Sequence, residues 1–362
     1  MSYDFSRWLH ISNFAKQGGI HVVKKSALVL LTVASLVIFV IIGGCNEVET
    51  IAIPAKNQKY PEKPITVIVP FSPGGGLDLT TRSLEKFALK HLGQPVAIIN
   101  KTGSAGALGW NELAGSTPDG YTAGATSGEI LLLSIYSSGK YNYITALSPI
   151  AQIASVPMLL AVQADQPYQT LNDLVEYAKK HPEQLKFGNG GMGSLSHVLL
   201  EMLNHDAGIA IEQVPFSGGG ETIPALLGGH VQLIFINPVP IKEHVKSGKV
   251  KILAVTGEQR IADPVFADVP TFKEQGFEIT INNWQGIAVP KETPVAIKNK
   301  LAEKFKAIIN DPEFKENMER VGNQVEYLGP EESTNKWIAD SQKLQTTLQQ
   351  SGILEQIKAQ KK

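Results

Sequence analysis

The sequence predicts an α/β protein whose sheets are mainly parallel. Short β-branched runs alternate with amphipathic stretches along most of the chain, a pattern typical of strands joined by helices. Turns rich in glycine and hydroxyl side chains follow several of these runs, and ligands of open α/β sheets bind at such strand ends. With 362 residues, of which 43% are hydrophobic, the chain is long enough for two globular lobes.

The composition argues against several classes of partner. The net charge is −1, and Lys and Arg are scattered rather than gathered into a stripe, so we expect no nucleic-acid partner. The eight histidines show no H-E-x-x-H or similar spacing, so we expect no metal. Cys45 is the only cysteine, which excludes a disulfide within one molecule.

Residues 1–44 have the pattern of a secretory signal. Lys24 and Lys25 precede an apolar or small-residue run, residues 27–42, as a basic segment precedes the apolar segment of a signal peptide. A short membrane anchor is the alternative, because the run lies at the lower edge of spanning length. Residues 1–23 form a long leader, which either an upstream start codon chosen in error or an extended basic segment explains.

The end of the apolar run resembles the lipobox of bacterial lipoproteins, an aliphatic residue and two small residues before a cysteine. The chain has Ile42, Gly43, Gly44 and Cys45 at these places. The resemblance implies that Cys45 is lipidated, becomes the mature N-terminus and anchors the protein to the outer side of a bacterial membrane. Residues 45–59 are polar after the cysteine and contain proline, so we expect a tether there.

The folded part begins near residue 60 with a predicted strand, turn and helix. Residues 65–69 form a β-branched run and residues 72–76 a glycine-rich turn. A helix follows, in which Asp78 and Arg82 stand four apart as an ion pair. Its N-terminus offers free N–H groups and a favourable dipole to an anion. Alternatively, the glycines serve only the conformation of the turn.

Two more turns follow strands in this part of the chain. Residues 96–99 predict a strand, residues 100–106 a small-residue turn and residues 107–114 a helix. The turn at 118–121 leads into a strand that ends at 126–128. We expect these turns to meet at one edge of a sheet.

A second lobe repeats the pattern. Pro157 separates two apolar runs, 150–156 and 158–162, and we expect the chain to cross between lobes there. Thr170, with Asp173 three residues later, predicts the start of a helix over 170–180. Residues 214–220 lead into a helix that is expected to continue through residue 227. Further strands and helices are expected at residues 185–187, 195–203, 231–236, 250–255, 284–289, 296–309 and 331–349.

Residues 188–194 contain G-x-G-x-x-G between a predicted strand and a predicted helix, a pattern also found in dinucleotide-binding proteins. The strand ending in an acidic residue about twenty positions later, which that function requires, is not evident. We therefore favour a second anion-receptive helix N-terminus and expect no cofactor.

From residue 60 to its end, the chain resembles the Bug, or TctC-like, receptors of tripartite tricarboxylate transporters. The first block of that family is matched by Pro70, Phe71, Pro73, Gly74, Gly75, Asp78 and Arg82. Later blocks are matched in the same order by Gly103–Gly106, Pro118–Tyr121, Thr126–Gly128, Gly191, Gly193, Ser194, His197 and Leu227–Gly229.

The resemblance implies a two-lobed periplasmic-binding-protein fold of type II, with the ligand cleft between the lobes. The first lobe is expected to take residues 60–155 and 285–362, and the second lobe residues 156–284. The resemblance also implies a monomeric receptor without catalytic activity, which binds a small carboxylate and delivers it to the integral-membrane subunits of a transporter. An α/β enzyme and a sensory binder that use the same turns are the alternatives.

Three departures from the family pattern bear on the ligand. Leu77 replaces a frequent threonine, Phe216 a common tyrosine and Ile236 an aspartate. Because Ile236 stands where the family often has an acidic residue, the departure argues against recognition of an amino group on the ligand. We therefore expect a di- or tricarboxylate or an aromatic carboxylate rather than aspartate or glutamate.

Four residues have two interpretations each. Asp78 either contacts ligand-bound water or caps a helix, and Trp284 either lines the cleft or packs at the hinge. For His197 we favour a structural hydrogen bond over ligand contact. A hydrolase pair of Ser194 and His197 is disfavoured, because G-x-S-x-G and a placed acidic partner are lacking. The candidate ligand-binding residues are Ser72, Pro73, Gly74, Gly75, Asp78, Ser104, Ala105, Gly106, Thr126, Ser127, Asn189, Gly191, Gly193, Ser194 and Asn237.

Overall fold

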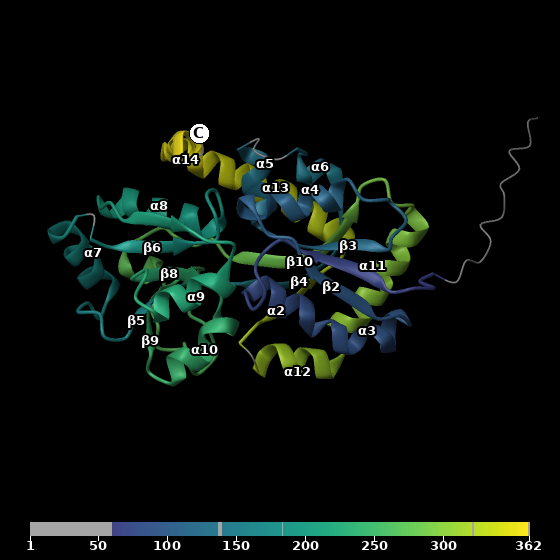
Figure 1. Ribbon diagram of the computed structural model, residues 1–362, viewed down its shortest axis with the longest axis horizontal. Coiled ribbons are helices and arrows are strands. Elements are labelled where there is room, and N and C mark those ends of the chain that lie inside the picture. The colour runs from purple at the N-terminus through teal and green to yellow at the C-terminus, as the bar shows by residue number, and fades with distance from the viewer. Residues whose placement is uncertain (1–59, 137–139, 183, 321, 361–362) are drawn as a thin grey trace, which may run out of the picture. The chain divides into compact units, whose positions relative to one another are not determined.

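The computed structural model describes residues 60–136, 140–182, 184–320 and 322–360. They belong to one compact unit of the chain and form two sheets with helices on their faces (Figure 1). The predicted signal, Cys45 and the tether lie outside the described residues. Within the described part, no helix is both long and apolar enough to cross a membrane.

The first lobe is built on a six-stranded sheet with the order β11-β4-β10-β3-β1-β2. Strand β1 is the predicted run, and it pairs in parallel with β2 and β3. Strand β10 runs antiparallel between β3 and β4, and β11 pairs antiparallel with the other edge of β4. The strands are β1 (Ile65–Val69), β2 (Val96–Asn100), β3 (Thr122–Ser127), β4 (Leu147–Val156), β10 (Asn283–Pro290) and β11 (Val325–Leu328).

Helices cover both faces of this sheet, and a separate apolar cluster lies between the sheet and the helices on each face. One cluster contains Phe87, Phe305 and Phe314, and the other contains Trp284, whose ring stacks on Trp337 with centroids 5.4 Å apart. Trp284 is therefore a packing residue. The helices are α2 (Gly76–Ser83), α3 (Glu85–Leu92), α4 (Ala107–Ala114), α5 (Glu129–Ile135), α6 (Tyr143–Ala146), α11 (Val295–Ile309), α12 (Pro312–Arg320) and α13 (Pro330–Gln350), with a 3₁₀ turn at Ser104–Gly106.

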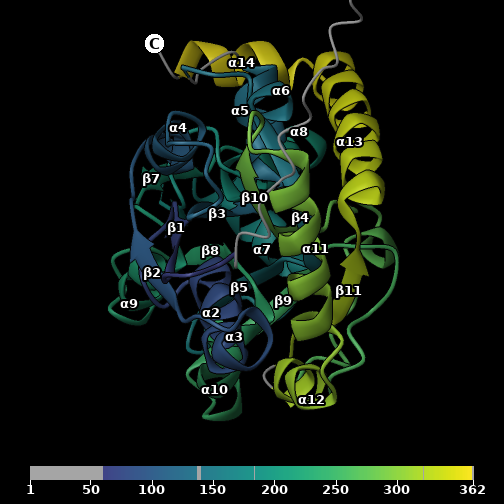
Figure 2. The ribbon, with the colours of Figure 1, turned by 90° about the vertical axis from the view of Figure 1, so that its right-hand side faces the viewer.

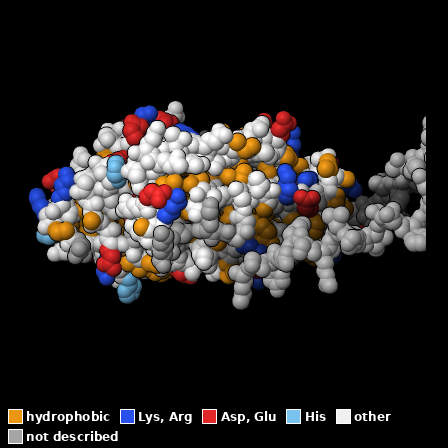
Figure 3. All heavy atoms as spheres, turned by 90° about the horizontal axis from the view of Figure 1, so that it is seen from above, with side chains coloured by type: hydrophobic (Ala, Val, Ile, Leu, Met, Phe, Trp, Pro, Cys, Tyr) orange, Lys and Arg blue, Asp and Glu red, His pale blue; other side chains and the backbone are white. Residues whose placement is uncertain are grey.

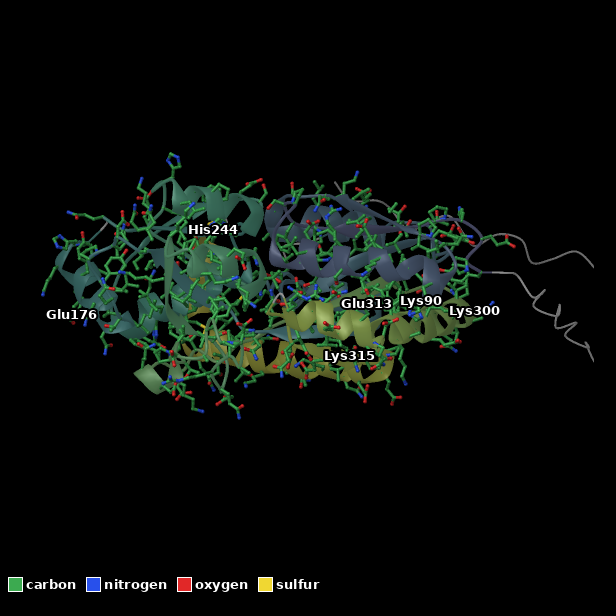
Figure 4. The ribbon with its side chains drawn as sticks, turned by 90° about the horizontal axis from the view of Figure 1, so that it is seen from below. Lys90, Glu176, His244, Lys300, Glu313 and Lys315 are labelled. Atoms are coloured by element: carbon green, nitrogen blue, oxygen red, sulfur yellow. The ribbon has the colours of Figure 1, made fainter. Side chains whose placement is uncertain are left out.

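Charged side chains connect α3 to α12 at the surface of the first lobe. Lys90 contacts Asp311 at 2.6 Å, and Lys86 pairs with Glu313. Figure 4 labels Lys90 and Glu313 on these two helices. The Lys86–Glu313 pair is exposed and adds little to stability, whereas Asp311 is buried. Beneath both pairs, the rings of Phe87 and Phe314 pack edge to face with centroids 5.6 Å apart.

The second lobe is built on a five-stranded sheet with the order β7-β6-β8-β5-β9. Its first helix begins as predicted, because the Thr170 hydroxyl accepts from the Asp173 N–H at 3.1 Å and the Asp173 carboxylate accepts from the Thr170 N–H at 3.0 Å. The elements are β5 (Leu159–Gln163), α7 (Leu171–Lys180), β6 (Lys186–Asn189), α8 (Leu195–Ala207), β7 (Glu212–Pro215), α9 (Gly219–Leu227), β8 (Leu233–Ile236), α10 (Pro238–Lys246), β9 (Val250–Val255) and a 3₁₀ turn at Lys273–Gln275.

The expectation of mainly parallel sheets is wrong. Within the part of the chain that the structure describes, four strand pairings are parallel, and five are antiparallel. The physical reason lies in the passage between lobes. Strand β4 carries the chain toward the second sheet and β10 brings it back, so the two neighbours run in opposite directions.

The chain leaves the first sheet at Val156 and enters the second at Leu159, on either side of Pro157, and it returns at Asn283. We propose these two crossings as the lobe borders. The last helix, α14 (Ile353–Gln360), does not follow the expected assignment of residues 285–362 to the first lobe, because its apolar side chains join the cluster of the second. Helix α13 packs on β4 and α5, whereas α14 packs on α8 (Figure 2).

The surface carries both signs of charge. Figure 3 shows Lys and Arg side chains next to Asp and Glu side chains over one face of the protein.

Candidate functional site

A cavity of about 60 Å³ lies between the two lobes. The N-terminal ends of five helices line it: α2 and α5 from the first lobe, and α8, α9 and α10 from the second. The first N–H groups of a helix have no partner within the helix, and the dipole places positive potential at that end. The lining residues are Phe71, Gly75, Gly76, Leu77, Ser127, Glu129, Met158, Gly190, Ser194, Ser196, Gly218, Gly219, Thr222, Phe235, Ile236, Asn237 and Asn283.

The two lobes touch directly beside this cavity. The Ser72 N–H of the first lobe donates to the Ser217 carbonyl of the second lobe at 3.0 Å. A Cβ atom added to Gly220 would lie 1.9 Å from the Pro73 carbonyl oxygen. Glycine at this position therefore permits the close approach of two backbones, and the structure is a closed form.

The turn before α2 is held by Asp78. This carboxylate is 1% exposed, and it accepts from the Gly74 N–H, from Arg82 Nε and from Asn100 Nδ2, each at 2.9 Å. Burial alone would raise the pKa of Asp78, but these hydrogen bonds and the Arg82 charge hold it below its ordinary value. Asp78 thus fixes the turn and pairs with Arg82, rather than facing the cavity.

Glu129 is the charged residue among those that line the cavity. It stands at the first position of α5 and is 7% exposed. The Ser127 hydroxyl donates to its Oε2 atom at 2.5 Å, and the Leu195 N–H at the start of α8 is a second donor. Burial raises the pKa of the Glu129 carboxyl, and the hydrogen bonds oppose that rise in part.

Four of the residues predicted from the sequence line the cavity: Gly75, Ser127, Ser194 and Asn237. Pro73 and Gly74 belong to the same turn as Gly75. Ser72 begins this turn, is 3% exposed, and its hydroxyl has no hydrogen-bond partner among the described residues. A buried hydroxyl of this kind is costly unless a ligand or a water satisfies it.

Four other predicted residues line a second, larger hollow of about 930 Å³. Ser104, Ala105 and Gly106 reach it from the first lobe, and Gly191 reaches it from the second. A Cβ atom added to Gly191 would lie 3.0 Å from the Ala105 backbone nitrogen, so the lobes are also close here. Residues of α14 complete the wall of this hollow.

The remaining predicted residues serve the framework of the fold. Asn189 donates to Gln213 and accepts from the Gly191 N–H, both at 2.8 Å. The Gly193 N–H donates to His197 Nδ1 at 2.8 Å. Thr126 is fully buried, its hydroxyl has no partner in the described part of the chain, and it lines neither hollow.

Ser194 and His197 do not form a hydrolase pair. Both ring nitrogens of His197 are used elsewhere: Nδ1 contacts the Gly193 N–H, and Nε2 contacts Gln360 Oε1 at 2.8 Å. The Ser194 hydroxyl accepts from the His197 N–H at 3.4 Å and contacts Ser196, so it caps α8. Among the described residues, no cluster of His, Cys, Asp and Glu could hold a metal ion.

Four polar lining residues were missed by the sequence analysis: Glu129, Ser196, Thr222 and Asn283. Glu129 immediately follows the turn at 126–128, so an acid at the first position of the next helix was an available signal. Asn283 lies where the chain returns from the second lobe to the first. Its Oδ1 atom accepts a hydrogen bond from the Gly128 N–H at 3.2 Å. Only the folded arrangement brings these two segments together.

Two lobes that close over a cavity lined by helix N-termini define a solute-binding protein of the periplasmic type. The structure is similar to that of the periplasmic binding protein BugD, with a TM-score of 0.77 and 31% identity, covering 81% of this chain and 99% of BugD. It is also similar to MatC from Rhodopseudomonas palustris with bound malate, with a TM-score of 0.71 and 27% identity, covering 82% and 99% of the two chains.

Sequence comparison identifies the family. Residues 80–353 match the model of the tripartite tricarboxylate transporter family receptor. The protein BugT of Bordetella pertussis is 34% identical over 247 residues, which cover 67% of this chain and 75% of BugT. The chain therefore belongs to the tripartite tricarboxylate transporter receptor family, as its motifs predicted.

Proposed function

We propose that this protein captures a small carboxylate between its lobes and delivers it to the membrane subunits of a tripartite tricarboxylate transporter. The observation that carries the proposal is the convergence of five helix N-termini on one cavity between the lobes. Backbone N–H groups and helix dipoles bind an anion without a basic side chain. Closure of the lobes buries the ligand and presents a changed surface to a membrane partner.

The relatives support a carboxylate as the ligand class. MatC was solved with bound malate, and the family model describes a receptor rather than an enzyme. The geometry of Ser194 and His197 argues in the same direction, because no nucleophile and base face each other there. We propose that the ligand leaves the protein chemically unchanged.

The cavity size bears on the choice among carboxylates. A water molecule occupies about 10–15 Å³ on this measure, so the closed cavity of about 60 Å³ suits a ligand of few atoms. The di- and tricarboxylates and aromatic acids expected from the sequence remain in the proposal.

We further propose an extracytoplasmic location, with the protein held to the membrane by lipid on Cys45 and acting as a monomer. The lipobox of the sequence supports this anchor. Metabolic labelling with palmitate tests it: wild type incorporates the label, and C45A does not. Co-purification of transporter subunits with the wild-type receptor separates delivery to a transporter from a purely sensory role.

The first test of the ligand is thermal unfolding of residues 46–362 against a panel of carboxylates. A ligand that binds only the folded state raises the unfolding midpoint. The proposal expects at least one di-, tri-, amino- or aromatic carboxylate to do so and to be recovered intact. Stabilisation by a nucleotide alone, or turnover of a stabilising compound, would replace the receptor with an α/β enzyme.

A further inference from the structure

The single acid in the cavity wall constrains the ligand beyond its carboxylate. Glu129 is 7% exposed, and among the described residues that line the cavity there is no lysine, arginine or histidine. An ionised carboxylate at such a site lacks an opposite charge in its immediate surroundings. A ligand that is only an anion would add a second negative charge to the same small space.

The hydrogen bonds of Glu129 indicate what it still lacks. All three of its partners are donors: the Ser127 hydroxyl at 2.5 Å, the Leu195 N–H and the backbone N–H of Glu129 itself. The carboxylate is thus held as an acceptor, and a carboxylate has about four acceptor positions. Three donors leave about one acceptor position for a donor on the ligand.

We propose that Glu129 selects ligands that carry a cationic nitrogen beside their carboxylate, as an amino acid does. The ammonium group lies against the Glu129 carboxylate, and the ligand carboxylate lies against the N-terminal turns of α2, α8, α9 and α10. An ammonium group supplies up to three donors and the missing positive charge. The inference rests on the proposed carboxylate-binding function and narrows its ligand class.

This inference revises the expectation drawn from Ile236. The apolar residue at the end of β8 argues against a ligand with an amino group only if no other position supplies an acidic side chain to the cavity. Glu129 reaches the same cavity from the opposite lobe, and Ile236 and Glu129 both line it. The acidic group is therefore present, but in the first lobe rather than the second.

Isothermal titration calorimetry with matched ligand pairs tests the inference. Each pair differs only by the amino group: aspartate and succinate, glutamate and glutarate, alanine and propanoate. The proteins are wild type, Glu129→Gln and the matched control Glu112→Gln. Glu112 pairs with Lys101 at 3.3 Å on the surface, where its side chain is 44% exposed, so the control removes the same charge far from the cavity wall.

We expect wild type and E112Q to bind one amino acid about 30-fold or more tightly than its partner without the amino group. In E129Q this preference disappears or reverses, while circular dichroism and the unfolding midpoint establish that the variant folds. The wild-type comparison needs no variant and remains decisive if E129Q does not fold.

Two results overturn the inference. One is that wild type binds a plain dicarboxylate as tightly as its amino partner. This result is clearest if titrations in two buffers of different ionisation enthalpy show that a proton is taken up on binding, because the Glu129 carboxyl is then neutral in the complex. The other is an amino preference that survives in E129Q. If no carboxylate of either kind binds wild type or E129Q, the proposed receptor function itself fails, which is a distinct outcome.

Discussion

Substituting Gly220 by alanine should prevent full closure of the lobes. The added Cβ would lie 1.9 Å from the Pro73 carbonyl oxygen, whereas real Cβ contacts shorter than 3.0 Å essentially do not occur. The two backbones must therefore separate by at least about 1.1 Å, the difference between these distances. The hydrogen bond from the Ser72 N–H to Ser217, now 3.0 Å long, would stretch to about 4.1 Å and break.

The expected consequence is weaker ligand binding without loss of folding. One lost inter-lobe hydrogen bond and a cavity left open to water cost about 1–3 kcal/mol, roughly a 5- to 150-fold weaker affinity. Gly220 lies inside α9, where alanine is favoured over glycine by up to about 1 kcal/mol. The unliganded variant should thus be as stable as wild type or slightly more stable.

Calorimetry gives the affinity of G220A for the best carboxylate of the thermal panel, and small-angle X-ray scattering at saturating ligand gives its compaction. Gly329→Ala is the matched control, because a Cβ there meets its nearest neighbour at an ordinary 3.5 Å. G329A should bind and compact as wild type does. Wild-type affinity and compaction in G220A would refute the argument that these backbones meet in the ligand-bound form.

Three further predictions concern stability and binding. Because the pKa of Asp78 is lowered in the folded state, its contribution is present above the unfolded pKa and is lost as the pH falls through the folded pKa. D78N should therefore lower the unfolding free energy at neutral pH by about 1–3 kcal/mol and flatten its decline in acid, as measured by urea unfolding; an unchanged acid profile would contradict this. The buried Ser72 hydroxyl has no partner among the described residues, so S72A should raise the unfolding free energy of the unliganded protein by up to about 1–3 kcal/mol while weakening ligand affinity; equal affinity by calorimetry would show that the ligand does not use the hydroxyl. Leu354 of α14 is 3% exposed, so L354A should cost about 2–5 kcal/mol in urea unfolding, whereas L89A, at a leucine that is 67% exposed, should cost no more than about 0.5 kcal/mol; similar costs would mean that α14 is not packed on the second lobe.

Local signals in the sequence predicted much of the fold. The run at 65–69 is β1 with the same bounds, and the helix predicted at 107–114 is α4. The capping of α7 by Thr170 was predicted because that interaction spans only three residues. Such features depend on neighbours in the chain, and the sequence contains those neighbours.

Features that depend on distant segments escaped the sequence analysis. The direction of β10 relative to β4 follows from the return of the chain between lobes, which strand propensity does not encode. The packing of α14 on the second lobe is likewise set by apolar contacts far away in the chain. Asn283 enters the cavity wall for the same reason, because its partner Gly128 lies 155 residues earlier.

The glycine-rich turns illustrate why a motif alone did not decide between a conformational and a functional role. Gly74 has a φ of 79° and open space around its missing Cβ, so glycine there serves the shape of the turn. Gly220 has no such φ, but the opposite lobe lies against it. The absence of a side chain at Gly220 matters only in the closed form, where the backbones of the two lobes are in contact. The first role occurs in the turn before α2 and the second at the start of α9, and together they let helix N-termini from both lobes surround one cavity.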